Sequence, residues 1–103
     1  MKMFLISDNV DTLMGMRLSG VEGVVLHEED KVRAKLKSLM QREDIALILM
    51  TKTAVDLCRD MVYDYKLNQK QPLIIEIPDR HGNGGAAQSL SQYVSDAIGI
   101  KLN

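Results

Sequence analysis

Short aliphatic segments alternate along the chain with longer segments in which apolar residues recur at helical spacing. The aliphatic segments are residues 3–6, 24–26, 45–50 and 73–77. Residues 45–50 contain no polar position, a pattern typical of a central strand that is covered on both faces. The four segments are therefore predicted to be β-strands.

Three longer segments repeat their apolar residues every three or four positions, which predicts amphipathic helices. The apolar positions are Val32, Leu36, Leu39 and Met40 in a helix over 31–41; Val55, Cys58, Met61, Val62 and Tyr65 in a second; and Ala87, Leu90, Tyr93, Val94, Ala97 and Ile98 in a last one. Asp8 and Asp11 fit the N-cap and third position of a short additional helix, and Thr53 with Asp56 repeats this arrangement. Each predicted strand is thus followed by a helix.

The alternation of strands and helices predicts the fold class. Successive βαβ units form a parallel sheet with right-handed crossovers. We therefore expect an α/β fold, a small doubly wound domain of Rossmann or receiver type with four parallel strands. By analogy with other small three-layer folds, we expect the strand order 2-1-3-4. Residues 1–77 are predicted to form this core domain, 78–86 a glycine-rich flexible connector, and 87–103 a C-terminal helix.

Composition and charge restrict the classes of partner. The 103 residues include 13 basic and 14 acidic side chains mixed along the chain, so no basic stripe predicts nucleic-acid binding. The longest apolar run, 45–50, is far shorter than the roughly 18 residues that span a bilayer. In the first residues, "MKMFLIS", the uninterrupted apolar run covers only 3–6, which is shorter than the roughly 7–15 apolar residues of a secretory signal. We therefore expect a cytoplasmic protein without direct membrane insertion.

The connector contains Gly82, Gly84 and Ala87 at the spacing of a dinucleotide-binding fingerprint. That fingerprint opens the first helix of a βαβ unit and needs an acidic residue about 20 positions later to hold the ribose. Here the glycines follow the last predicted strand, and only 16 residues come after Ala87. We therefore expect no cofactor, and we interpret the glycines as residues that relax the backbone of the connector.

Candidate reactive residues do not assemble into a site. Asp8 and Asp11 resemble the acidic Mg²⁺ pair of a response-regulator receiver, but Thr51 stands where a receiver has its phospho-accepting aspartate. A helix-capping role is therefore favoured, and a degenerate receiver-like or phosphorelay signalling domain is the alternative function. His27 and His81 lie in different loops without a second ligand nearby, so no metal site is expected.

Two single residues differ from their surroundings. Cys58 has no second cysteine with which to form a disulfide, and we interpret it as a small, buried apolar side chain. Glu76 is an acid in an otherwise apolar strand. A carboxylate with a raised pKa would suit catalysis, whereas an edge strand would let Glu76 reach solvent or an arginine. The edge-strand interpretation is favoured.

Three stretches together resemble the F subunit of V-type ATPases, including the bacterial and archaeal rotary ATP synthases. They are "MKMFLISDNVDTLMGMRLSGVEG", "IALILMTKTAVD" and "PLIIEIPDRHG". Residues 15–20 stand in a Gly-hydrophobic-Arg-Leu-hydrophobic-Gly segment, 49–51 in a strand ending in Ile/Met-Thr, and 72–78 match a Pro-hydrophobic-hydrophobic-hydrophobic-Glu-Ile-Pro strand. The resemblance covers essentially the whole chain, and the connector "RHGNGG" departs from it.

The resemblance implies a non-catalytic subunit of the central stalk, the rotor, that binds the coiled-coil D subunit. Through this stalk, ATP hydrolysis or synthesis in the catalytic A/B ring is coupled to ion translocation by the membrane rotor subunits, and the subunit itself is peripheral to the membrane in the V1 sector. The residues predicted to bind the partner are Arg17, Leu90, Tyr93, Val94, Ala97 and Ile98. Arg17 could instead pair with an acid of its own domain such as Glu22, and the stripe of the last helix could cover the last strand.

Overall fold

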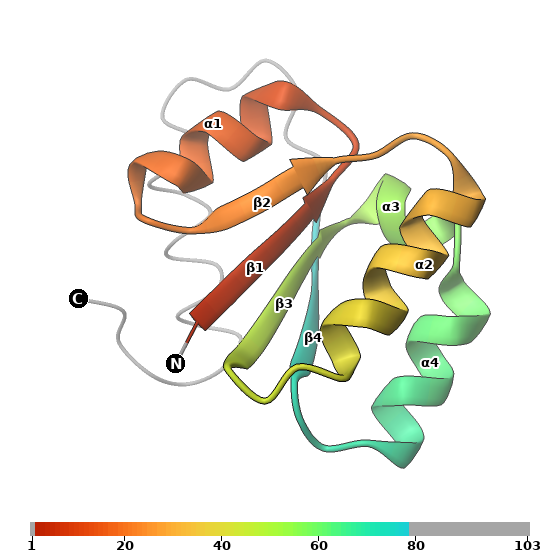
Figure 1. The fold of residues 1–103 in the computed structure, drawn as a ribbon. Helices are drawn as coiled ribbons and strands as arrows, with labels where there is room; N and C mark the ends of the chain where they lie inside the picture. Colours follow the sequence, from red (N-terminus) through yellow and green to blue (C-terminus); the bar gives the residue numbers. More distant parts are fainter. Residues whose placement is uncertain (1, 79–103) are drawn as a thin grey trace.

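The computed structural model describes residues 2–78, which fold around one parallel β-sheet (Figure 1). The elements are β1 (Lys2–Ser7), α1 (Val10–Leu18), β2 (Glu22–Val25), α2 (Glu29–Met40), β3 (Ile45–Thr51), α3 (Lys52–Asp56), α4 (Arg59–Asn68) and β4 (Leu73–Ile77). The strands lie in the order β2-β1-β3-β4, and every pairing is parallel. The predicted α/β fold and strand order are confirmed.

Helices cover both faces of the sheet, as expected of a doubly wound fold. α2, α3 and α4 lie on one face (Figure 1), where Leu36 of α2 packs in one cluster with Ile48 of β3. α1 lies on the opposite face over β1 and β2, and its Met16 packs in a second cluster with Leu5. The sheet is therefore the middle of three layers, with a separate apolar core on each side.

β3 is the most deeply buried strand. All of its residues except Ala46 are buried. Successive side chains point to opposite faces of a strand, so Ile48 and Met50 belong to the cluster under α2 and α4, while Leu47 and Leu49 belong to the cluster under α1. This two-sided burial explains the uninterrupted apolar sequence and confirms that the segment is a central strand.

The single helix predicted through residues 55–65 is wrong, because the chain forms two helices there, α3 and α4. The Cys58 N–H donates to the carbonyl oxygen of Val55, three residues earlier, at 2.9 Å, which tightens and ends α3. Cys58 then adopts a non-helical conformation, with φ −149° and ψ 39°, and α4 begins after it. The apolar spacing concealed this break because Val55, Cys58 and Val62 all face the same core.

The predicted helix caps Asp8 and Thr53 are also wrong. The N-cap of α1 is Asn9, whose side-chain oxygen accepts the backbone N–H three residues later at 2.7 Å. The Ser7 hydroxyl accepts the Asn9 N–H at 3.0 Å, and this bond holds the turn so that Asn9 directly precedes the helix. The N-cap of α3 is Thr51, which places Thr53 inside the helix.

β2 and α2 both begin two residues earlier than the sequence pattern predicted. Glu22 pairs with Phe4 and Gly23 pairs with Leu5, so both residues belong to β2. Neither has an apolar side chain, and the aliphatic pattern therefore missed them. α2 begins at Glu29, and the acidic residues of its first turn interact favourably with the positive end of the helix dipole.

Several predictions lie outside the described residues. These are the C-terminal helix with its apolar stripe, the connector beyond Pro78, and the division of the chain at residues 78 and 87. Between residues 2 and 78, no helix has the length and apolar character needed to cross a bilayer.

Candidate partner-binding surface

The carboxyl ends of parallel strands are where doubly wound folds bind ligands. Ser7 ends β1 and Thr51 ends β3 at this edge, and both side chains are buried. The Ser7 hydroxyl donates to the Asn9 carbonyl oxygen at 2.8 Å, and the Thr51 hydroxyl accepts the Asp8 N–H at 3.2 Å. These hydroxyl groups therefore hold the turn between β1 and α1 against β3.

The two acids of the predicted receiver-like pair have different surroundings. Burial raises the pKa of Asp8, but hydrogen bonds from the Thr51 and Asn9 side chains outweigh it, so the pKa lies below its ordinary value. Asp11 is exposed in the first turn of α1, where its negative charge interacts favourably with the positive end of the helix dipole. Between residues 2 and 78, no group of three His, Cys, Asp or Glu side chains is arranged to hold a metal ion.

Neither Thr51 nor Cys58 is presented as a reactive group. Thr51 is 2% exposed at the position where a receiver has its phospho-acceptor. Burial raises the pKa of the Cys58 thiol, which disfavours the nucleophilic thiolate, and the predicted burial of this residue is confirmed. His27 Nε2 lies 2.8 Å from the Asp8 carbonyl oxygen and ties the loop after β2 to the turn after β1; His81 lies outside the described residues.

Glu76 forms an ion pair at the β4 edge of the sheet. Arg59 Nη1 donates to Glu76 Oε1 at 3.1 Å, and the Arg59 guanidinium also binds Asp56. The pKa of Arg59 is raised, mainly by its hydrogen bond to Asp56 and secondly by its hydrogen bond to Glu76. The interpretation of Glu76 as an edge-strand residue with an arginine partner is confirmed.

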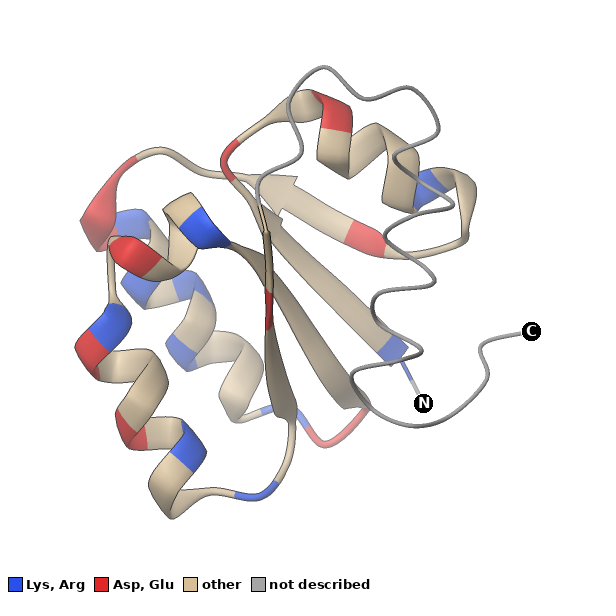
Figure 2. Ribbon diagram, turned by 180° about the vertical axis from the view of Figure 1, so that it is seen from behind, with Lys and Arg blue, Asp and Glu red and all other residues tan. Residues whose placement is uncertain are grey.

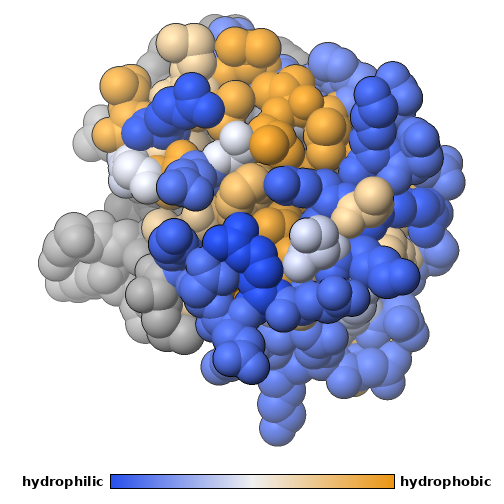
Figure 3. Space-filling view, viewed as in Figure 1, coloured by the Kyte–Doolittle hydropathy of each residue, from blue (hydrophilic) through white to orange (hydrophobic). Residues whose placement is uncertain are grey.

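α1 is apolar on both its inner and its outer side. Met16 is buried against the sheet, and Leu13 packs beside it. On the outer side, Val10 is 57% exposed, Met14 60% and Leu18 87%. We call these three residues the apolar ridge of α1; Figure 3 shows hydrophobic residues gathered over α1 and β2, and hydrophilic residues over α2.

The apolar ridge was not predicted from the sequence. The signal was present as a four-residue repeat in "VDTLMGMRL", but a repeat of this kind also marks the buried side of a helix. Only the position of the sheet shows that Met16 and Leu13 face inward and that the repeat faces outward.

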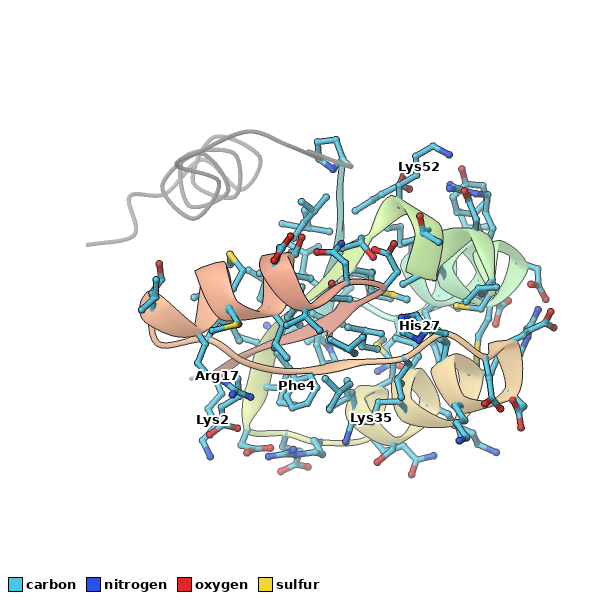
Figure 4. The ribbon with its side chains drawn as sticks, turned by 90° about the horizontal axis from the view of Figure 1, so that it is seen from above. Lys2, Phe4, Arg17, His27, Lys35 and Lys52 are labelled. Atoms are coloured by element: carbon cyan, nitrogen blue, oxygen red, sulfur yellow. The ribbon has the colours of Figure 1, made fainter. Side chains whose placement is uncertain are left out.

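Arg17 is exposed at the end of α1, beside the apolar ridge. It lies on the side of the molecule that also carries Lys2 and Phe4, while His27 and Lys52 lie toward the carboxyl ends of the strands (Figure 4). Among residues 2–78, no acid forms an ion pair with Arg17, so the alternative pairing with Glu22 does not occur. Both side chains instead line a groove of about 430 Å³ along β2, together with Phe4, Gly20, Val21, Gly23 and Val24.

Comparison with known proteins gives one consistent family. Residues 3–94 match the model of the ATP synthase (F/14-kDa) subunit family. The chain is similar to the A-type ATP synthase F subunit of Thermococcus kodakarensis, with 33% identity over 107 residues that cover 99% of this chain and 98% of the relative. It is also similar to the corresponding A-type ATP synthase F subunit of Methanocaldococcus jannaschii, with 31% identity and 99% of each chain covered. The chain therefore belongs to the ATP synthase F subunit family.

Proposed function

We propose that the protein is a non-catalytic subunit of the central stalk of a V/A-type ATPase or ATP synthase and binds the coiled-coil D subunit. In this role it is part of the rotor that couples ATP hydrolysis or synthesis in the A/B ring to ion translocation by the membrane rotor subunits. The similarity to F subunits over nearly the full length of both chains carries the proposal.

The chemistry at the strand ends supports a role without catalysis. Ser7, Asp8 and Thr51 are engaged in the hydrogen bonds that join β1, α1 and β3. Cys58 is fully buried. A subunit that transmits torque needs a rigid fold and a partner surface, and it needs no reactive group of its own.

Two regions are proposed to bind the D subunit. The first is Arg17, whose guanidinium is exposed and has no ionic partner among residues 2–78. The second is the apolar stripe Leu90, Tyr93, Val94, Ala97 and Ile98, whose helical spacing suits a groove between partner helices. In the assembled complex the subunit belongs to the cytoplasmic V1 sector.

Co-purification with the D subunit tests this proposal. We expect the full chain and a tagged D subunit to elute together from a size-exclusion column at equal stoichiometry. The double variant Leu90→Asp/Val94→Asp should bind D much more weakly because two carboxylates would have to be buried. Separate elution of the two wild-type proteins at micromolar concentration would refute the proposed function.

Arg17 has a matched control in Lys66. Both are exposed basic residues in the last turn of a helix, Arg17 in α1 and Lys66 in α4. We expect Arg17→Ala to weaken D binding only mildly, because a single exposed ion pair contributes little. Lys66→Ala should leave the affinity unchanged. If the two variants have equal effects on the affinity, Arg17 does not contribute to the interface.

A further inference from the structure

The outer side of α1 is exposed although it is apolar. A surface helix normally has one apolar stripe that faces the core and a polar side that faces water. α1 satisfies the first condition through Met16, which is 2% exposed, but its outer side carries the apolar ridge Val10, Met14 and Leu18. Leu18 alone leaves 87% of its surface in solvent.

The apolar ridge has the geometry of one row of a helix–helix contact. At 3.6 residues per turn, Val10, Met14 and Leu18 fall within an arc of about 80°, roughly opposite Met16. The row is about 12 Å long. Rows of residues spaced four apart are the ridges that fit between the ridges of a second helix.

The apolar ridge is flanked by one acid and one base. Asp11 and Arg17 lie on opposite sides of it, each about 60° from its centre by the same helical geometry. Figure 2 shows one acidic and one basic position near opposite ends of α1. Neither side chain forms an ion pair with another residue in the described range 2–78.

We propose that the apolar ridge of α1 is a docking surface for one helix of the coiled-coil stalk subunit. The partner helix packs its own apolar row along Val10, Met14 and Leu18. It places a basic residue near Asp11 and an acidic residue near Arg17, as flanking charges do in coiled coils. This inference rests on the proposed stalk function and names a surface for it, separate from the C-terminal stripe.

The flanking charges fit a heterologous helix better than a second copy of this chain. In a two-fold antiparallel pair of α1 helices, each flank faces the same flank of the other copy, so Asp11 cannot meet Arg17. In a two-fold parallel pair the opposite flanks meet, but the two charges are about 9 Å apart along the axis. A different partner can satisfy both charges at once.

The test measures the affinity of the full-length protein for the D subunit by calorimetry. Leu18→Glu should weaken binding by about tenfold or more, since a charge would have to be buried in the apolar contact. Leu67→Glu is the matched control, because Leu67 is 84% exposed on α4 and should change the affinity less than about twofold. Circular dichroism would confirm that both variants remain folded.

The possible results separate this inference from the proposed function. If wild-type protein binds D and Leu18→Glu binds equally well, the docking surface is refuted and the stalk function stands. If wild-type protein does not bind D, both are refuted. A dimer of wild-type protein that Leu18→Glu disrupts, without any loss of D binding, would assign the ridge to a second copy and also refute the inference. A large loss of thermal stability in Leu18→Glu without D would assign it to the protein's own chain.

Discussion

α1 and α2 lie on opposite faces of one sheet, and they differ in the residues on their outer, solvent-facing sides. Each buries an apolar side chain against a strand, Met16 in α1 and Leu36 in α2. Their outer sides differ: charges cluster on α2 and its neighbours, whereas α1 has one charge near each end (Figure 2). The inner side of each helix is therefore determined by its packing on the sheet, whereas the two outer sides differ in whether their residues are charged or apolar.

The outer side of α2 carries two ion pairs of Arg33, one to α4 and one within α2 itself. Arg33 Nη2 binds Asp60 Oδ1 at 2.8 Å and Arg33 Nε binds Glu29 Oε2 at 3.0 Å. Lys35 lies over the Phe4 ring, with Nζ 5.0 Å from the ring centroid. These polar groups of α2 are thus paired within its own domain, whereas the outer side of α1 leaves its apolar ridge exposed.

The largest effect on folding is expected for Leu36→Ala in α2. Leu36 has no exposed surface, so truncation removes buried methyl groups and leaves a cavity between the helix and the sheet. The free energy of unfolding should fall by about 2–5 kcal/mol. Urea denaturation followed by circular dichroism measures this change, and a loss below about 1 kcal/mol would show that the core under α2 can close over the cavity.

The second largest effect is expected for Gly23→Ala, which tests the inner contact of α1. A Cβ atom at residue 23 would lie 2.7 Å from the Leu5 carbonyl oxygen and 2.9 Å from Leu13 Cδ1. Because the first of these atoms belongs to the backbone, β1 or β2 has to move, and we expect a loss of about 1–3 kcal/mol.

Gly20→Ala provides the control for Gly23→Ala. Gly20 has φ 86°, but a Cβ atom at this residue would meet no atom within 4 Å, so its substitution adds backbone strain without a collision. Urea denaturation compares the two variants. If Gly23→Ala is as stable as the wild type, the close packing of α1 on β1 and β2 is contradicted.

The sequence predicted the apolar inner sides of α2 and α4, and analogy with small three-layer folds predicted the order of the strands. An uninterrupted apolar run such as 45–50 has one physical explanation, burial on both faces, and β3 has that burial. Glu76 was also interpretable, because a single acid in an apolar strand is stable only at an edge or beside a base, and Arg59 supplies the base.

Features that depend on three-dimensional placement could not be predicted. The break at Cys58 keeps the apolar spacing of one continuous helix, so periodicity cannot reveal it. Asp8 and Asn9 are both good caps, and the Ser7 hydroxyl that selects Asn9 acts through the geometry of the turn. The ridge residue Leu18 has the same chemistry as a core leucine, and only the position of the sheet shows that it is exposed.

A smaller effect is expected for Asp60→Asn, which removes the link between α2 and α4. Hydrogen bonds from Arg33 lower the pKa of Asp60 in the folded protein. In the unfolded chain an aspartate has a pKa of about 3.9. The folded-state pKa is the lower one, so this pair stabilises the protein above about pH 3.9 and loses its contribution as the pH falls through the folded value.

The stability of Asp60→Asn should therefore be slightly below that of the wild type at pH 7. Thermal denaturation at several pH values measures the difference, which should disappear in strong acid and shrink at high salt. Asp64→Asn, on the same helix, is the control without an ion pair in the described part of the chain. A difference that grows toward acidic pH would contradict the assigned direction of the Asp60 pKa shift.

The smallest effect on folding is expected for Leu18→Gln, although the same residue type at position 36 should give the largest. Leu18 is 87% exposed and glutamine is a good helix former, so the free energy of unfolding should change by no more than about 0.5 kcal/mol. Leu67→Gln, at 84% exposure on α4, should behave in the same way, and urea denaturation compares both with Leu36→Ala. A loss at Leu18 comparable with that at Leu36 would mean that the protein's own chain packs on the outer side of α1, and the contrast between the two helices would no longer hold.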